Sequence, residues 1–469
     1  MQVHWHRRDL RTADNRGLSV ATDAGPTVPL FVFDDAVLAH AGAPRVRFML
    51  DALAELRERY RALGSDLVVR RGDPREVVVR VAREFDADRV VWNKDYSGLA
   101  RERDAAVRRA LDGADVARES VHDHLHHEPG SITTNKGDPY SVYTYFWKKW
   151  RDREKADPYP DPDEGALAAV DAETTGDLPS IEALGFEAPD ATVPTAGTAA
   201  ARERLDRFCD DAVFRYESDR DYPTRDAVSR LSADLKWGTI GVREVYAATA
   251  AAMAEAGEEK AEESVAEFQS QLAWREFYTH VLFFNPEVVT ENFKEYENEI
   301  EWRDDPEELA AWRAGETGYP IVDAGMRQLR EEAYMHNRVR MIVASFLTKD
   351  LRCDWRHGYA HFRAKLADHD TQNDNGGWQW AASTGTDAQP YFRIFNPMTQ
   401  GERYDPDAEY IAEYVPELRG VDPSVVHSWH ECSPLQRRNA APAYPEPIVD
   451  HSERREAALS MFERARGED

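Results

Sequence analysis

Cysteine is scarce in this sequence, and long apolar runs are absent. The 469 residues include three cysteines, Cys209, Cys353 and Cys432, which are too few and too scattered for a disulfide framework or a zinc site. No window approaches the ~18–20 apolar residues of a membrane span, and the amino terminus has no apolar stretch of signal-peptide type. We therefore expect a cytoplasmic protein that makes no contact with membranes.

Lysine is scarce as well, and acidic residues dominate the charge. The sequence has 59 Lys and Arg against 87 Asp and Glu, a net charge of −28, and most of its basic residues are Arg. This composition is typical of proteins from salt-loving organisms, in which a highly charged surface maintains solubility. The charge argues against a nucleic-acid partner, but in about 1 M salt the screening length falls to roughly 3 Å. Binding to nucleic acid would then depend on stacking and shape.

The first 130 residues alternate short apolar runs with amphipathic stretches, and they contain no Gly-x-Gly-x-x-Gly or Walker-type loop. The predicted strands are Gln2–His6, Val28–Phe33, Asp66–Arg70, Arg89–Trp92 and Val116–Val121. The predicted helices are Arg45–Leu63, Pro74–Glu84 and Ala100–Leu111. This alternation predicts an α/β domain with a five-stranded parallel sheet, Rossmann-like, with helices on both faces.

Two further regions follow. Residues 131–199 are predicted to be an interdomain linker, because 157–198 is rich in Asp, Pro, Ala, Gly and Thr and has little periodicity. Residues 200–469 are predicted to form an all-α domain, since helical periodicity dominates and Trp becomes dense. Its predicted helical segments are Arg202–Leu235, Ser264–Phe284, Asp323–Leu351 and Tyr359–Ala367.

The densest cluster of polar and aromatic residues lies between Ala367 and Pro397, in A-D-H-D-T-Q-N-D-N-G-G-W-Q-W-A-A-S-T-G-T-D-A-Q-P-Y-F-R-I-F-N-P. Three acids, two Asn, a Gly pair and two Trp within fourteen residues argue against a structural helix. They indicate a polar wall beside an aromatic platform, as a planar ligand with an imide edge requires. From the residues alone, a helix-capping turn with Trp378 and Trp380 in the core is an equal alternative.

This stretch resembles the flavin-binding signature of the photolyase and cryptochrome family. Further motifs of that family occur in order along the chain: W-H-R-R-D-L-R-T-x-D-N (Trp5–Asn15), S-R-L-S (Ser229–Ser232), Q-L-A-W-R-E-F-Y (Gln271–Tyr278), T-G-Y-P-I-V-D-A-G-M-R-Q-L (Thr317–Leu329) and M-H-N-R-V-R-M (Met335–Met341). The resemblance covers essentially the whole chain. It implies an antenna domain, an all-α FAD-binding domain, and light-driven repair of cyclobutane pyrimidine dimers in DNA, as in class I photolyases.

The resemblance assigns roles to individual residues around FAD. Asp368 would pair with Arg340 beside the flavin ring, Asp370 would accept a hydrogen bond from the ring imide, and Asp374 would face the central ring nitrogen. The other positions that match flavin contacts are Tyr216, Ser229, Arg230, Leu231, Ser232, Arg275, Asn337 and His369.

A second set of residues would contact DNA. Photolyases are among the enzymes that extrude the target nucleotide from the duplex, and the resemblance implies that Trp274 and Trp380 form apolar walls for the flipped dimer. The other matching positions are Arg220, Gln271, Asn337, Arg338, Met341, Arg393 and Gln400. Without the family, Arg220, Arg393 and Gln400 would be interpreted as solvated polar residues.

Trp302, Trp355 and Trp378 match the three-tryptophan electron relay that photoreduces the flavin in this family. Their spacing does not reveal a relay, and a single Trp is more often a core aromatic.

A histidine cluster carries a different hypothesis. If the strand ending near Val121 continued, His122, His124 and His126 would lie on one side of it, where a metal could bind. We expect no metal, and we interpret these residues and His127 as polar residues at the end of a strand.

Two positions depart from the family's bacterial pattern. Asp374 stands where dimer photolyases usually have Asn and plant cryptochromes commonly have Asp, and a protonated acid there favours a neutral radical. Gln271 replaces the Glu that contacts the 5′ base of the lesion; it can hydrogen-bond to the base but cannot lend charge or a proton. Both changes concern the flavin's redox state and the repair efficiency.

The family leaves alternatives open. A cryptochrome-type blue-light photoreceptor without repair activity is the main one, although the lesion-facing residues are otherwise present. Repair of the pyrimidine–pyrimidone photoproduct would require His in place of Asn337 and Met341. Val90–Asp104 is similar to antenna-region segments, so a second chromophore, a deazaflavin or a folate, is a further expectation. We expect a monomer that binds UV-damaged DNA.

Overall fold

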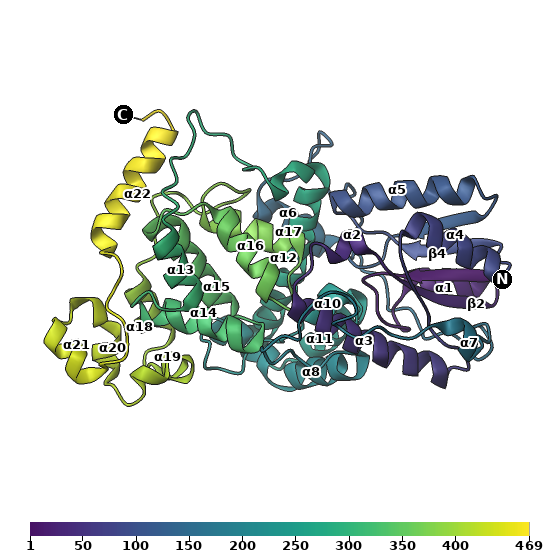
Figure 1. Cartoon of the computed structure of the whole chain (residues 1–469), viewed down its shortest axis with the longest axis horizontal. Helices are drawn as coiled ribbons and strands as arrows, with labels where there is room; N and C mark the ends of the chain where they lie inside the picture. The colour runs from purple at the N-terminus through teal and green to yellow at the C-terminus, as the bar shows by residue number, and fades with distance from the viewer. Residues whose placement is uncertain (469) are drawn as a thin grey trace.

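Five parallel strands form a sheet at the amino-terminal end of the computed structural model, which describes residues 1–468 (Figure 1). The strands are β1 (Gln2–His6), β2 (Thr27–Phe33), β3 (Val68–Arg71), β4 (Arg89–Asn93) and β5 (Ala117–Val121). Their order is β3-β2-β1-β4-β5, and every neighbouring pair is parallel. The predicted five-stranded parallel sheet is confirmed.

Helices cover both faces of this sheet. They are α1 (Arg16–Ala24), α2 (Asp35–Leu38), α3 (Ala43–Ala62), α4 (Pro74–Glu84) and α5 (Gly98–Asp112). The last three agree with the predicted helices to within two residues at each end. The other two were not predicted, because α1 has only nine residues and α2 only four, and both are shorter than the roughly 11–18 residues over which helical periodicity is recognised.

The segment between β5 and α8 packs against the rest of the chain. It contains α6 (Tyr143–Asp152) and α7 (Ala172–Thr175). Leu167 forms a β-bridge with Thr27, and Leu167, Ile181 and Leu184 are buried in one core cluster with residues of α3. The predicted linker region therefore packs on both parts of the chain: α6 contacts the helical part, and the later residues cover the α/β part. The boundaries at 130 and 199 stay predictions.

The remaining chain is helical, as predicted. Its α-helices are α8 (Thr198–Asp210), α9 (Tyr216–Asp219), α10 (Ser232–Trp237), α11 (Val242–Glu255), α12 (Glu259–Phe284), α13 (Pro306–Ala314), α14 (Pro320–Glu332), α15 (Asn337–Ser345), α16 (Trp355–Lys365), α17 (Thr371–Ala381), α18 (Pro397–Tyr404), α19 (Glu409–Tyr414), α20 (Pro423–His427), α21 (Pro434–Ala440) and α22 (His451–Ala465). The π-helical turn η3 (Phe346–Asp350) and the 3₁₀ turns η1 (Ala212–Arg215), η2 (Pro286–Val289), η4 (Pro416–Leu418) and η5 (Trp429–Glu431) complete it.

Three predictions about this region were wrong. The segment expected to be helical over Arg202–Leu235 is interrupted between α9 and α10, because Pro223 cannot donate a helical hydrogen bond and Arg230 adopts a left-handed conformation (φ 54°). The helix expected over Asp323–Leu351 is interrupted, because Ala333 adopts a left-handed conformation (φ 51°) that ends α14, and a new helix starts after His336. The Asp- and Asn-rich stretch that seemed unsuited to a helix forms α17. Its Gly376 packs so closely on Tyr278 of α12 that an added Cβ would lie 2.2 Å from the ring, so tertiary packing accounts for the glycine.

Two large apolar cores occupy the helical part. One gathers buried residues from α13 onward, including Trp378 of α17, and the other gathers residues from α6 and from α8 to α12, including Tyr216 and Leu272.

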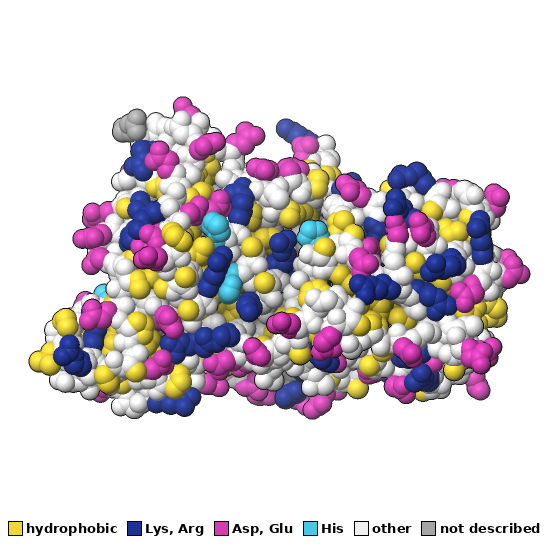
Figure 2. Space-filling model, viewed as in Figure 1, with side chains coloured by type: hydrophobic (Ala, Val, Ile, Leu, Met, Phe, Trp, Pro, Cys, Tyr) yellow, Lys and Arg dark blue, Asp and Glu magenta, His cyan; other side chains and the backbone are white. Residues whose placement is uncertain are grey.

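On the face shown in Figure 2, acidic and basic side chains are interspersed over both ends of the molecule. Within residues 1–468, no helix is both long and apolar enough to span a membrane.

Candidate functional site

Three buried carboxylates gather where the chain enters α17. Arg340 of α15 forms an ion pair with Asp368, with 2.7 Å between Nη2 and Oδ2, and its Nη1 lies 3.8 Å from Oδ1 of Asp374. Burial by itself would lower the pKa of Arg340, but the two carboxylates raise it above its ordinary value. The structure therefore brings together Asp368, Arg340 and Asp374 as the sequence predicts.

Asp370 joins the helical part to the sheet. Its Oδ2 lies 2.8 Å from Nη2 of Arg8, which follows β1, and its Oδ1 lies 3.6 Å from Nζ of Lys236 in α10. Burial would raise the pKa of Asp370, but Arg8, Lys236 and Arg275 hold it far below its ordinary value. Asp370 is therefore a charged acceptor at neutral pH.

Arg8 and Lys236 had no predicted role, although Arg8 lies inside a quoted family motif. Burial and the neighbouring Arg8 lower the pKa of Lys236 to about 8. Two signals could have pointed to these residues. One is the pair of adjacent arginines after the first strand, and the other is the rarity of lysine in this chain.

His369 completes the cluster. Its Nδ1 lies 2.5 Å from Oδ2 of Asp374. Burial lowers the pKa of His369, and Asp374 opposes that effect only in part, so the ring is mainly neutral at pH 7. The carboxylate of Asp374 is thus placed between a cation, Arg340, and a neutral imidazole.

A cavity of about 690 Å³ opens beside this cluster. Ser229, Arg230, Ser232 and Asp368 line it, as do Arg207 and Tyr334, which the sequence did not single out. The size is in the range of ligand pockets, which hold a few polar groups at fixed positions.

The residues present fit FAD. One buried oxygen of each of Asp368 and Asp370 has no hydrogen-bond partner among the described residues, so acceptors remain for the N–H edge of a flavin. Hydroxyl groups and an arginine on the cavity wall are suited to phosphates and ribose.

The other predicted flavin contacts lie near this cavity or behind it. Tyr216 and Leu231 are buried in the second helical core. Arg275 donates to the carbonyl oxygens of His124 (2.7 Å) and Leu235 (3.0 Å), and burial lowers its pKa to about 10. Arg230 has a left-handed backbone (φ 54°), and its guanidinium pairs with Glu332 at 3.0 Å.

A second cavity, of about 810 Å³, opens beside α15 and α17. Arg338, Met341, Trp380 and Arg393 line it, four residues that the sequence assigned to DNA contacts. Phe392, which was not predicted, lines it too and has 57% of its surface exposed. The adjacent residues Arg340 and Met341 therefore serve two different sites.

The remaining predicted DNA contacts lie outside the lining of this cavity. Trp274 stacks on Tyr143 with ring centroids 3.6 Å apart and an interplanar angle of 10°. Gln271 donates to Oε1 of Glu267 at 3.0 Å, and Arg220 pairs with the same carboxylate.

Asn337 and Gln400 are the last two residues of the predicted DNA set. The amide nitrogen of Asn337 lies 3.9 Å from the sulfur of Met341, as expected for positions i and i+4. The amide oxygen of Gln400 is buried without a partner among residues 1–468.

The three tryptophans of the predicted relay follow one another through the structure. Trp378 packs so closely against α16 that a Cβ on Gly358 would lie 2.0 Å from its ring, and Trp355 is the first residue of that helix. Trp302 precedes Arg303, whose backbone N–H donates to the carbonyl of Arg352 at 2.7 Å. Both Trp355 and Trp378 are fully buried, whereas Trp302 is half-buried. Their role as a relay stays a prediction.

The histidine hypothesis fails on its geometry. The strand β5 ends at Val121, so His122, His124 and His126 do not share a strand face. Within residues 1–468, one group of three or more His, Cys, Asp or Glu side chains could hold a metal, because its ligand atoms all lie within 4.8 Å of one another. This group is His4, His6 and Asp9, at a different place in the fold.

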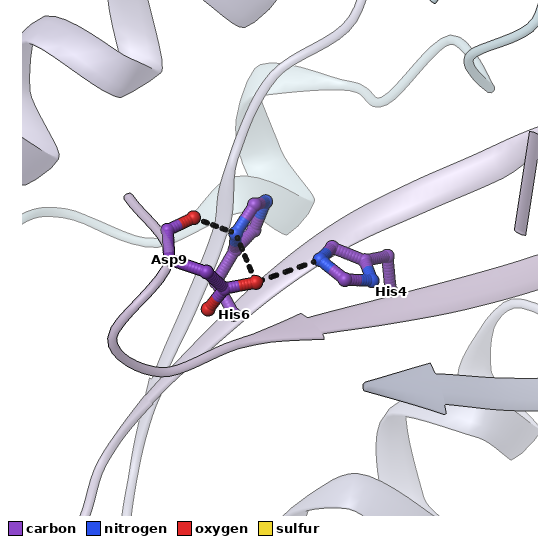
Figure 3. Close-up of side chains that lie close together, drawn as sticks. All are labelled: His4, His6 and Asp9. Carbon is purple, nitrogen blue, oxygen red and sulfur yellow. Dashed lines mark hydrogen bonds and ion pairs between the residues drawn. The ribbon is translucent and has the colours of Figure 1, made fainter. Parts of the chain in front are cut away.

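That second group is a hydrogen-bonded hub (Figure 3). His4 Nε2 lies 3.2 Å from Oδ2 of Asp9, and His6 Nδ1 lies 3.0 Å from the Asp9 carbonyl oxygen. Asn93 of β4 donates to the same Oδ2 at 2.6 Å, and Nε2 of His6 lies 2.6 Å from the hydroxyl of Tyr60. Existing hydrogen bonds thus occupy most of the atoms a metal would need, and the hub connects β1, β4 and α3.

Comparisons with known proteins agree with this arrangement. A family model described as DNA photolyase matches residues 2–163, and one described as the FAD binding domain of DNA photolyase matches residues 268–464. A deoxyribodipyrimidine photo-lyase from Halobacterium salinarum is 66% identical over 481 residues, covering all of both chains. That similarity agrees with the predicted origin in a salt-loving organism.

Two solved structures are similar over nearly the whole length. A bacterial class III photolyase from Agrobacterium tumefaciens has a TM-score of 0.91 and 34% identity, covering 99% of this chain and 98% of that one. An archaeal photolyase from Sulfolobus tokodaii, described with two FAD molecules and a novel light-harvesting cofactor, has a TM-score of 0.85 and 32% identity, covering 99% of each chain. Because both family models match and relatives are similar over nearly the whole length, the chain belongs to the DNA photolyase family and takes FAD as its cofactor.

Proposed function

We propose that this protein repairs cyclobutane pyrimidine dimers in DNA when illuminated. The observation that carries the proposal is that α15 and α17 each contribute residues both to the carboxylate cluster and to the second cavity. Arg340 and Asp374 belong to the flavin side, while Met341 and Trp380 line the other cavity. Two short helices thus hold a cofactor and a flipped base close together, and the relatives named as deoxyribodipyrimidine photo-lyases support this assignment.

FAD bound in its reduced form supplies, on absorbing blue or near-UV light, an electron that splits the cyclobutane ring and afterwards returns. The chain's residues prepare for this transfer. The ion pair between Arg340 and Asp368 would provide fixed charges beside the flavin ring. The ionised Asp370 would accept a hydrogen bond from the flavin's imide, and Asp374 would face the central ring nitrogen.

The second cavity receives the lesion. Trp380 provides an apolar wall on which a base can stack, and Met341 provides a second. Stacking of a base on an aromatic ring contributes roughly 1–3 kcal/mol and depends little on salt, which suits a highly acidic protein. Arg338 and Arg393 are placed at the mouth to contact the DNA strand.

Two further roles belong to the same proposal. Trp378, Trp355 and Trp302 carry electrons from the surface to the flavin when it must be reduced. The α/β part holds a second, light-harvesting chromophore; a deazaflavin or a folate was expected from the sequence, and the two FAD molecules described for the Sulfolobus relative add a flavin to these classes. We propose that the protein acts as a monomer.

The test is light-dependent loss of thymine dimers from UV-damaged DNA, with purified, photoreduced protein at high salt. We expect dimer loss only in the light, and we expect Trp380→Ala to weaken binding of dimer-containing DNA by roughly 5- to 150-fold. Trp147→Phe is the matched control, because Trp147 is a half-buried tryptophan outside both cavities. A protein that binds and reduces flavin but leaves dimers intact would instead be a cryptochrome-type photoreceptor.

A further inference from the structure

Helix α6 carries positive charge in a chain that is otherwise acidic. Residues 143–155 include five basic and two acidic side chains, although the chain as a whole has a net charge of −28. Three of the ten lysines of the chain, Lys148, Lys149 and Lys155, are in this segment. Since lysine is so rare here, its concentration on one helix needs a physical reason.

The charges lie on the outer face of the helix. Tyr143, Phe146 and Trp150 point into the second helical core, so the opposite side faces solvent. Tyr145 on that side has 58% of its surface exposed, and Lys148 and Lys149 are exposed as well. We call the exposed residues Tyr145, Lys148, Lys149, Arg151 and Arg153 the α6 basic face.

The two lysines of this face are free to bind an anion. Elsewhere lysines do form ion pairs, as Lys94 does with Glu128 and Lys236 with Asp370. Lys148 and Lys149 have no carboxylate oxygen within 4.0 Å among residues 1–468. An ammonium group without a protein partner can exchange its counterion for a phosphate.

The amino-terminal end of α6 adjoins the rim of the second cavity. The backbone N–H of Tyr143 donates to Oδ2 of Asp387, which lines that cavity, at 3.1 Å. The hydroxyl of Thr386 donates to the carbonyl of Ser141 at 2.7 Å, and the ring of Tyr143 stacks on Trp274. The helix that carries the α6 basic face is therefore attached at its amino-terminal end to the rim of the proposed lesion site.

The distance along the helix indicates what it can reach. Lys149 lies six residues beyond Tyr143, which corresponds to roughly 9 Å at the helical rise of about 1.5 Å per residue. One strand of DNA rises about 3.4 Å per nucleotide, so this separation corresponds to about two to three nucleotides.

We propose that the α6 basic face binds the phosphate backbone of the damaged strand about two to three nucleotides from the dimer. This inference rests on the proposed function. Phosphate contacts position a protein on DNA without reading the sequence, and a locally positive face supplies the register that a negatively charged surface cannot. Tyr145, which lies between the rim and the lysines, would pack on the sugar or base of an intervening nucleotide.

The experiment compares the flavin-loaded double variant Lys148→Gln/Lys149→Gln with the wild type. Affinity for a duplex with one central thymine dimer is measured by fluorescence anisotropy between about 0.3 and 2 M KCl. Each phosphate contact contributes about −0.9 to the slope of log K against log salt, so we expect the slope to become shallower by about 1 to 2. Lys260→Gln/Lys365→Gln is the matched control, because it removes the same charge from two other exposed lysines. The flavin absorption spectrum verifies that both variants are folded.

Trimmed duplexes locate the contact. If the duplex ends one nucleotide beyond the dimer on the side that meets α6, we expect the wild type to bind as weakly as the double variant, and the variant to lose nothing more. An unchanged salt slope, or an equal change in the control variant, would overturn the proposal.

Undamaged duplex separates this proposal from the previous one. The α6 contact predicts a shallower slope for damaged and undamaged DNA alike, whereas the lesion cavity acts on damaged DNA alone. If the wild type does not prefer dimers but the double variant still changes the slope, dimer recognition fails while the backbone contact holds. If the double variant binds an acidic protein more weakly but shows the wild-type salt slope with both duplexes, the face binds protein and the DNA contact is refuted.

Discussion

Asp370 and Glu276 are two acids buried at the junction between the sheet and the helices, and their protonation differs. Asp370 has 5% of its surface exposed and Glu276 has none. Arg8, Lys236 and Arg275 hold the pKa of Asp370 far below its ordinary value in spite of burial. Burial raises the pKa of Glu276 to about 7, because hydrogen bonds from the backbone N–H groups of His126 and His127 offset burial only in part and the carboxylate has no ion-pair partner among the described residues.

The difference shows that burial alone does not decide whether an acid is charged. At the flavin site three cations lower the pKa of one carboxylate, so the charge needed to accept a hydrogen bond is maintained. Around Glu276 the chain supplies imidazoles, and Arg275 lowers the pKa of Glu276 too little to offset burial. Burial lowers the pKa of His127 to about 3 and that of His280 to about 4, so these rings stay neutral at pH 7.

The largest effect is expected from Arg8→Ala, which would remove the main cation from Asp370. A carboxylate left buried without its partner typically costs about 3–5 kcal/mol, and Lys236 at 3.6 Å replaces only part of the lost attraction. We expect this loss in the free energy of unfolding, measured by urea denaturation of the FAD-loaded protein in high salt, together with weaker flavin retention. Arg8→Lys, which keeps the charge, is the control. A loss below about 1 kcal/mol would show that Asp370 does not depend on Arg8.

A smaller effect, of opposite sign, is expected from Glu276→Gln. The folded pKa of Glu276 is raised, so its contribution to stability is complete below the ordinary pKa of 4.5 and is lost as pH rises through about 7. The Gln variant should match the wild type at pH 4.5 to 5 and should be more stable by about 2–3 kcal/mol at pH 8, since a shift of one unit corresponds to about 1.4 kcal/mol.

The measurement is the free energy of unfolding of both proteins from pH 5 to pH 8. Asp323 and Asp350 also have pKa values raised by burial, to about 6, so the wild type's own pH slope includes them. The difference between the two proteins isolates Glu276. A difference that stays constant across this range would mean that Glu276 is already ionised in the folded protein at pH 5.

The smallest effect is expected at an exposed pair, which serves as the reference for both buried acids. Arg71 and Asp35 approach within 2.9 Å but are 47% and 64% exposed. Because exposed pairs contribute little and salt screens them, Arg71→Gln should change the free energy of unfolding by less than about 0.5 kcal/mol in 1 M salt. A loss comparable to that of Arg8→Ala would remove the distinction between buried and exposed pairs in this protein.

Much of the fold could be predicted from local patterns. The strand Gln2–His6 and the helix Pro74–Glu84 agree with the sequence to the residue, because apolar alternation and a proline at the first helical turn are local signals. The helix α17 could not be predicted in this way. Its Gly and Asn residues are weak helix formers, and contacts such as that of Gly376 with Tyr278 stabilise it only once α12 is in place.

The sequence by itself determined the parallel sheet, the helical remainder and, through the family motifs, the pairing of Asp368 with Arg340. The tertiary structure decided which cations face Asp370, because Arg8 and Lys236 are both far from Asp370 in the sequence. It also decided that the histidines after β5 lie beside a carboxyl group that has no ion-pair partner among the described residues, and that α6, with its basic side, starts at the rim of the lesion cavity. Charge states and shared surfaces depend on distances between segments far apart in the chain, and no local pattern records those distances.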